Sequence, residues 1–131
     1  MQQINPEPLG QPRGWTNGML APPASGILFV AGQTARDPAG RIVEGGFVDQ
    51  WEQALANVLM VVESAGGKPI NIARMTVFVT DLGEYKRSQK DIGAVWKARM
   101  GRHYPAMSVV EVTGLVDEGA MVEIEATAVI A

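Results

Sequence analysis

Five short segments of the chain have the pattern of β-strands. Each is an apolar or alternating run of β-branched and aromatic residues bounded by turn residues or glycine. The predicted strands are residues 26–33, 41–43, 75–80, 108–112 and 121–129. In the last strand the even positions from Val122 to Ala128 are apolar, whereas Glu123 and Glu125 lie on the other face. This strand therefore has one face suited to a core and one suited to water, a rim or a subunit contact.

Two longer segments have helical periodicity. In residues 49–65 four apolar residues, Trp51, Leu55, Val58 and Val62, recur at spacings of four, three and four, and Gly66 with Gly67 ends the pattern. In residues 84–100, Ile92, Trp96 and Met100 recur every four residues, and Gly101 follows. The sequence thus predicts two helices that each bury one face.

The order of these elements is strand, strand, helix, strand, helix, strand, strand. It predicts an α+β fold in which one sheet carries the helices on one face. The chain is long enough for one domain, spanning residues 1–131, and too short for two. Residues 5–25 are rich in proline and glycine, which argues against a helix near the N-terminus. We expect an irregular N-terminal segment and give its bounds within the domain as residues 1–14.

Composition and charge narrow the classes of function. The chain is 47% apolar and 19% charged, as in ordinary globular proteins, and it has no apolar stretch long enough to span a membrane. It contains no cysteine, which excludes disulfides and thiolate chemistry. A net charge of −3 with scattered basic residues argues against nucleic-acid binding. The N-terminus has no signal-like apolar run, so we expect a cytoplasmic protein.

Few residues are candidates for chemistry. The single histidine, His103, has neither a nucleophile nor further metal ligands at a suggestive spacing, and we interpret it as structural. Gly32 ends a strand, where glycine is usually a bulge and less often lets a ligand approach the backbone. Glu123 and Glu125 form the only close carboxylate pair within a strand, which favours a rim and leaves general acid–base chemistry open. Met107 has the position of a packing residue.

Several motifs, taken in order, resemble the RidA/YjgF family, also described as L-PSP endoribonuclease-like. They are FVAGQ at 29–33, QALAN at 53–57, SAGG at 64–67, MTVFVTD at 75–81, YPA at 104–106 and VEIEA at 122–126. The resemblance implies a chorismate-mutase-like fold, assembled as a homotrimer with ligand clefts between neighbouring subunits. It also implies hydrolysis of reactive enamines and imines, such as 2-aminoacrylate, to keto acids and ammonia without metal or organic cofactor.

The resemblance further implies site residues. It assigns Gly32 as the glycine whose backbone meets the ligand, Trp15 as the aromatic residue lining the cleft, and Glu123 as the group that orients the attacking water. The arginine that holds the substrate carboxylate in the family falls on Met107. Arginine binds a carboxylate through two charge-assisted hydrogen bonds of about 1.5–3 kcal/mol each. Its loss therefore lowers the binding affinity for a carboxylate-bearing substrate by roughly 100-fold or more. We therefore expect a more apolar or neutral ligand.

Three functions remain open from the sequence. The first is a homotrimeric small-molecule protein that binds or hydrolyses a metabolite, imine-type or related, other than the usual carboxylate-bearing enamine. The second is a 2-iminobutanoate/2-iminopropanoate-type deaminase with a relaxed carboxylate site. The third is a non-catalytic binding protein. If the chain is an enzyme, we expect a hydrolase that acts on C–N bonds without a cofactor. Cleavage of RNA is disfavoured by the single histidine and the negative net charge.

Overall fold

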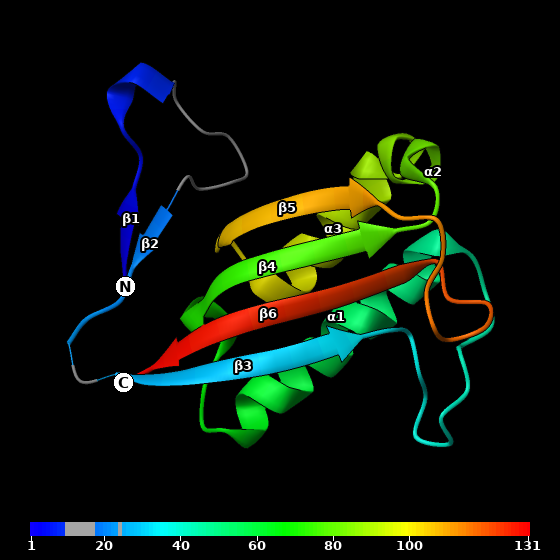
Figure 1. Cartoon of the computed structure of the whole chain (residues 1–131), viewed down its shortest axis with the longest axis horizontal. Coiled ribbons are helices and arrows are strands. Elements are labelled where there is room, and N and C mark those ends of the chain that lie inside the picture. The colour runs from blue at the N-terminus through cyan, green and yellow to red at the C-terminus, as the bar shows by residue number, and fades with distance from the viewer. Residues whose placement is uncertain (10–17, 24) are drawn as a thin grey trace.

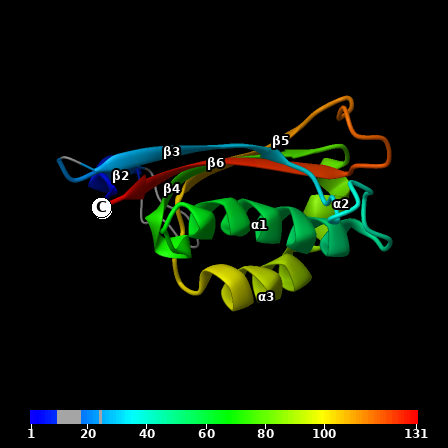
Figure 2. The ribbon, with the colours of Figure 1, turned by 90° about the horizontal axis from the view of Figure 1, so that it is seen from below.

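The computed structural model describes residues 1–9, 18–23 and 25–131. One four-stranded sheet forms one layer, and the helices form a second layer against a single face of it (Figures 1 and 2). The main elements are β3 (Gly26–Gln33), α1 (Phe47–Ser64), β4 (Ile72–Val79), α2 (Leu82–Arg87), α3 (Gln89–Met100), β5 (Ala106–Glu111) and β6 (Val122–Ile130). The predicted α+β class, with helices on one face, is confirmed.

The sheet is mixed, with the strand order β3-β6-β4-β5. The last strand, β6, lies between β3 and β4 and is antiparallel to both, whereas β4 and β5 are parallel. Parallel neighbours need a crossover connection, and α2 and α3 supply it. As a result β5 is one edge of the sheet and β3 is the other (Figure 1).

The core lies between α1 and the sheet. The predicted apolar face of α1 is confirmed, because Trp51, Leu55, Val58 and Val62 are all fully or almost fully buried. The even positions of β6 from Val122 to Ala128 are buried against it, as the alternation predicts. Each buried aliphatic side chain contributes about 1.5–3 kcal/mol relative to exposure, so this seam is the main source of the fold's stability.

The second predicted helix is two helices. The break is at Ser88, whose backbone has φ −99° and ψ 9° and ends α2 before α3 begins. The Asp81 carboxylate caps α2 by accepting a hydrogen bond from the backbone N–H of Glu84 at 3.2 Å. Serine competes with the helix for backbone hydrogen bonds and favours such boundaries, which the apolar spacing alone does not reveal.

Two other segments differ from the prediction. Residues 41–43 do not form a strand, and only one bridge joins Arg36 and Ile42. The Asp37 carboxylate accepts hydrogen bonds from the backbone N–H groups of Ala39 and Arg41, which hold the predicted turn. Near the N-terminus, β1 (Gln2–Ile4) pairs with β2 (Gly18–Leu20), so residues 1–14 are not irregular throughout.

The sheet face opposite the helices is open in the described part of the chain (Figure 2). It carries the outward residues of the strands, among them Phe29, which is 77% exposed, and half-buried Glu123. None of the helices in the described ranges combines the length and apolarity needed to cross a membrane. The fold therefore presents two separate surfaces for function, the open sheet face and the helix layer.

Candidate functional site

Gly32 and Glu123 come together at one end of the open sheet face. The pairing of β3 with β6 is regular as far as Val30 opposite Ala126 and resumes at Gln33 opposite Ile124, so Gly32 lies in an irregularity of the ladder. A Cβ atom on Gly32 would lie 2.8 Å from both Cδ and Oε2 of Glu123. The glutamate carboxylate therefore lies directly against the backbone of Gly32, and only glycine leaves room for it there.

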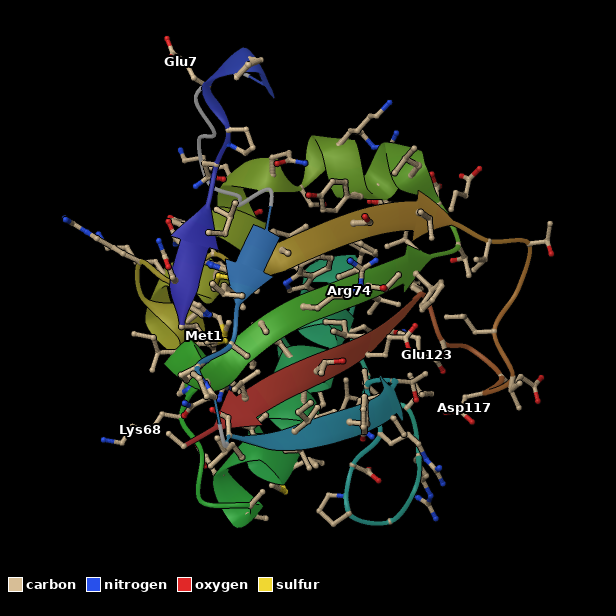
Figure 3. All side chains as sticks on the ribbon, turned by 60° about the vertical axis from the view of Figure 1, so that its left-hand side comes forward. Met1, Glu7, Lys68, Arg74, Asp117 and Glu123 are labelled. Atoms are coloured by element: carbon tan, nitrogen blue, oxygen red, sulfur yellow. The ribbon has the colours of Figure 1, made fainter. Side chains whose placement is uncertain are left out.

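None of the described residues pairs with the carboxylate of Glu123. The side chain is half-buried, and within the described residues it forms no hydrogen bond and no ion pair. Figure 3 shows Glu123 at the start of β6, at the end of the sheet where the loop that carries Asp117 leaves it. A carboxylate held against the backbone, with both oxygens unpaired, can accept a proton or orient a water molecule.

A buried glutamine of α1 fixes the start of β6 beside Glu123. Gln50 is only 3% exposed, and its side-chain N–H donates to the carbonyl of Gly119 at 3.0 Å. Its side-chain oxygen accepts from the backbone N–H of Met121 at 2.8 Å. The two bonds hold the loop end on the helix, so Gln50 positions the strand from which Glu123 projects.

An asparagine two turns further along α1 fixes the chain that follows Gly32. The Asn57 amide donates to the carbonyls of Thr34 and Arg36, at 3.0 Å and 2.9 Å. Gln53 in turn donates to the Asn57 side-chain oxygen at 2.9 Å, which sets the orientation of that amide. Gln53 and Asn57, the first and last residues of the QALAN motif, therefore hold the segment after Gly32 in place.

The loop that follows Gly32 and the loop that precedes β6 are also joined to each other. The hydroxyl of buried Thr34 donates to the carboxylate of Asp117, which lies in the loop before β6. The sequence reasoning missed Gln50, Asn57 and Thr34. The apolar spacing gave no signal for them, because Gln50 and Asn57 lie beside the predicted apolar face of α1 and Thr34 lies outside any helix.

Met107 lies in a different place. It is on β5, level with buried Met75 of β4, and it packs against the core on the helix side of the sheet. Glu123 is level with Phe78 and points to the open side. Within one copy of the chain, Met107 and Glu123 therefore do not face a common cleft.

Met107 lines a cavity of about 160 Å³ in the helix layer. The residues around this cavity are Trp51, Tyr85, Gln89, Ile92, Gly93, Trp96, Tyr104 and Met107. We refer to it as the aromatic cavity. The sequence predicts only Met107 among them as a site residue, and it predicts Trp51, Ile92 and Trp96 only for the buried faces of helices.

The remaining candidates from the sequence are His103, Trp15 and a possible metal site. The Nε2 atom of His103 lies 2.7 Å from the carbonyl oxygen of Ile72, which ties the turn before β5 to the start of β4 and supports a structural role. Trp15 lies outside the described residues. In the described ranges no group of three histidine, aspartate or glutamate side chains has an arrangement that could hold a metal ion.

Comparison with known proteins assigns the family. A model of the family described as Endoribonuclease L-PSP matches residues 14–130. The chain belongs to this family. It is 33% identical over 103 residues, 78% of the chain and 72% of the relative, to a goat protein named 2-iminobutanoate/2-iminopropanoate deaminase. It is 34% identical over 106 residues, 80% of each protein, to a RutC family protein of Pyrococcus horikoshii.

Solved structures agree with this assignment. A crystal structure of a Rid-family protein of unknown function from Yersinia pestis superposes with a TM-score of 0.83 at 30% identity, covering 97% of this chain and 96% of that one. The RidA/YjgF resemblance and its fold are therefore confirmed. Membership in the L-PSP family leaves the ligand to be inferred from the site residues, because one fold supports more than one function.

Proposed function

We propose that this chain forms a homotrimer and hydrolyses a small imine-type metabolite that lacks the carboxylate of the usual enamine substrates. The proposal depends chiefly on one observation, the Glu123 carboxylate that is held against Gly32 and has no partner among the described residues. That arrangement keeps a proton acceptor beside backbone that a small ligand can approach closely. The family assignment supports C=N chemistry, since relatives carry the name of an imine deaminase.

The separation of Met107 from Glu123 supports a site made by two copies. Met107 lies on the edge strand β5 and Glu123 on the open face, two strands away in the sheet order. A ligand can touch both only if the edge of one copy meets the open face of another. In this arrangement one copy supplies Glu123 and Gly32, and its neighbour supplies Met107.

The reaction needs only water and one base. Glu123 takes a proton from a water molecule as its oxygen adds to the imine carbon, and the C=N π electrons move to nitrogen. The proton then passes to nitrogen and gives the carbinolamine. The hydroxyl proton of the carbinolamine is next transferred to nitrogen through the same base, the C–N bond breaks as the C=O bond forms, and ammonia leaves with a carbonyl product. A positioned general base contributes roughly 10²–10⁴-fold to such a step.

The test is ammonia release from two imines generated in situ. One is phenylmethanimine, formed from benzylamine by a flavin amine oxidase, and the other is 2-aminoacrylate, which carries a carboxylate. We expect acceleration of the neutral imine, and a loss of about 100-fold or more in Glu123→Gln. Glu125→Gln is the matched control, because Glu125 is the exposed neighbour on the same strand face. Equal losses in both variants, or no acceleration in the parent, would contradict the proposal.

A second candidate is the deaminase of 2-imino acids. The 33% identical goat protein with that name favours it. The absence of a guanidinium at Met107 weighs against it, because a carboxylate then loses its bidentate partner. Release of ammonia from 2-aminoacrylate as fast as from the neutral imine would establish this second candidate in place of the first. Binding of ligands without any turnover would instead support a non-catalytic binding protein.

A further inference from the structure

The aromatic cavity has an uncharged and largely apolar lining. Four of its eight residues are the aromatic side chains Trp51, Tyr85, Trp96 and Tyr104, and none of the eight is charged. The rings of Trp51 and Tyr85 lie 5.6 Å apart at 32°, and those of Trp96 and Tyr104 lie 6.3 Å apart and nearly parallel at 4°. These rings offer apolar surface in a fixed arrangement.

The arrangement is held in advance of any ligand. The indole N–H of Trp96 donates to the carbonyl of His103 at 3.0 Å, which fixes the ring against the turn before β5. Trp51 is 1% exposed and belongs to the core. A ligand would therefore meet a wall that loses little conformational freedom on binding, which favours affinity.

A buried hydrogen-bond donor in this wall has no partner. Within the described residues, the Nε1–H group of Trp51 is the one buried side-chain polar group for which no acceptor is found. Buried donors are nearly always paired, with protein, water or ligand. This nitrogen is itself buried beneath the cavity surface, so the uncharged lining of the cavity, and not a hydrogen bond to Trp51, sets the class of ligand.

Gly93 keeps the cavity open. It lies in the middle of α3, where glycine is the poorest helix former except proline. A Cβ atom there would have no heavy atom within 4 Å outside the helix, so crowding does not explain the glycine. Gly93 shares the helix face of Gln89 and Trp96, which also line the cavity. A larger side chain at this position would project over the space that the aromatic rings enclose.

We propose that the aromatic cavity binds a neutral aromatic group about the size of benzene, and that Gly93 is required to admit it. The volume of about 160 Å³ is close to the roughly 150 Å³ of an engineered apolar cavity that holds benzene. An ion would lose its hydration with no opposite charge in the lining to compensate. The inference deepens the proposed function, because this group is the apolar substituent of the proposed imine.

The direct test is binding of three stable probes that share one ring. Benzyl alcohol is neutral, benzoate is an anion and benzylammonium is a cation. We expect titration calorimetry to give a Kd for benzyl alcohol at least about 10-fold lower than for either ion. Tighter binding of benzylammonium would indicate a cation site formed by the rings and would overturn the proposal. No measurable binding of benzyl alcohol would also overturn it.

Two variants locate the binding. Gly93→Leu fills the mouth of the cavity and should weaken benzyl alcohol at least about 10-fold, whereas Ala94→Leu adds the same side chain to an exposed neighbouring position and should not. Met107→Arg should shift the ratio of benzoate to benzyl alcohol affinity by about 100-fold toward benzoate. Met60→Arg, at a 60% exposed site on α1, controls for the added charge. Unchanged affinity in Gly93→Leu would exclude this cavity, even if Met107→Arg does not fold.

The test separates this inference from the proposed function. Benzyl alcohol contains no C=N bond, so its binding does not need Glu123, and Glu123→Gln should bind it with unchanged Kd. Binding of benzyl alcohol without any imine hydrolysis would contradict the proposed activity and still support the cavity as a binding site. Hydrolysis of phenylmethanimine that is unaffected by Gly93→Leu would support the proposed activity and contradict the role of the aromatic cavity.

Discussion

The carboxyl group of Glu123 occupies the space that a side chain at position 32 would need. The distance from the Cβ position of Gly32 to Oε2 of Glu123 is 2.8 Å, below any ordinary contact of a Cβ atom. The two residues lie on neighbouring strands, and the ladder between β3 and β6 is irregular at this point. The absence of a side chain at Gly32 thus sets the position of the Glu123 carboxylate, and substitution of Gly32 tests the site directly.

Gly32→Ala should lower activity far more than stability. The new methyl group must displace Glu123, but the clash is with the end of a half-buried, flexible side chain, so we expect the free energy of unfolding to fall by about 1 kcal/mol or less. A displacement of about 1 Å can reduce turnover by roughly 100-fold. Imine turnover and thermal unfolding measure the two effects. Gly26→Ala on the same strand is the control, since its nearest contact is an ordinary 3.4 Å; equal activity losses in the two variants would contradict the role of Gly32.

Gln50→Ala should destabilise the fold. It removes both hydrogen bonds to the loop before β6 and leaves the Gly119 carbonyl and the Met121 N–H without partners. Each lost hydrogen bond contributes about 0.5–1.5 kcal/mol, so chemical denaturation should show a loss of about 1–3 kcal/mol. Glu52→Ala on the same helix is the comparison, because it removes only an exposed ion pair with Arg99, of about 0–1 kcal/mol. A smaller loss for Gln50→Ala than for Glu52→Ala would show that Gln50 does not anchor this loop.

Asn57→Asp should be more harmful than its small change in shape suggests. The Asn57 amide donates to two carbonyls, and a carboxylate in its place would present only acceptors to them. We expect a loss of at least about 2 kcal/mol in the free energy of unfolding at neutral pH. Asn71→Asp is a useful control, because Asn71 donates to a single carbonyl, that of Val129. If Asn71→Asp were the more destabilising of the two, the assigned role of Asn57 would be wrong.

The apolar pattern of the sequence was sufficient for most of the fold. The spacing from Trp51 to Val62 and the alternation along β6 both report burial on one face, and both faces are buried as predicted. The break at Ser88 and the single bridge at residues 41–43 are local changes of the backbone. Such changes leave little trace in hydrophobic periodicity, because they do not change which side chains are apolar.

The site was less accessible from the sequence than the fold. The family motifs named Gly32 and Glu123 as site residues, and the structure places the two side by side. The placement of Met107 on the opposite side of the sheet follows from the parallel register of β5 beside β4, which no spacing in the sequence determines. The aromatic cavity was missed for a similar reason, since its rings come from segments that only the crossover between β4 and β5 brings together.

Two glycines of α3 should respond oppositely to alanine. Gly93 has helical backbone and open space around its Cβ position, so Gly93→Ala should raise the free energy of unfolding by about 0.5–1 kcal/mol. Gly101 ends the same helix with a φ of +63°, a conformation that strains any residue with a side chain, so Gly101→Ala should lower it by about 1 kcal/mol or more. Denaturant unfolding of both variants measures the difference. A destabilised Gly93→Ala would show that the glycine is needed for packing, and its explanation as an opening to the aromatic cavity would then fail.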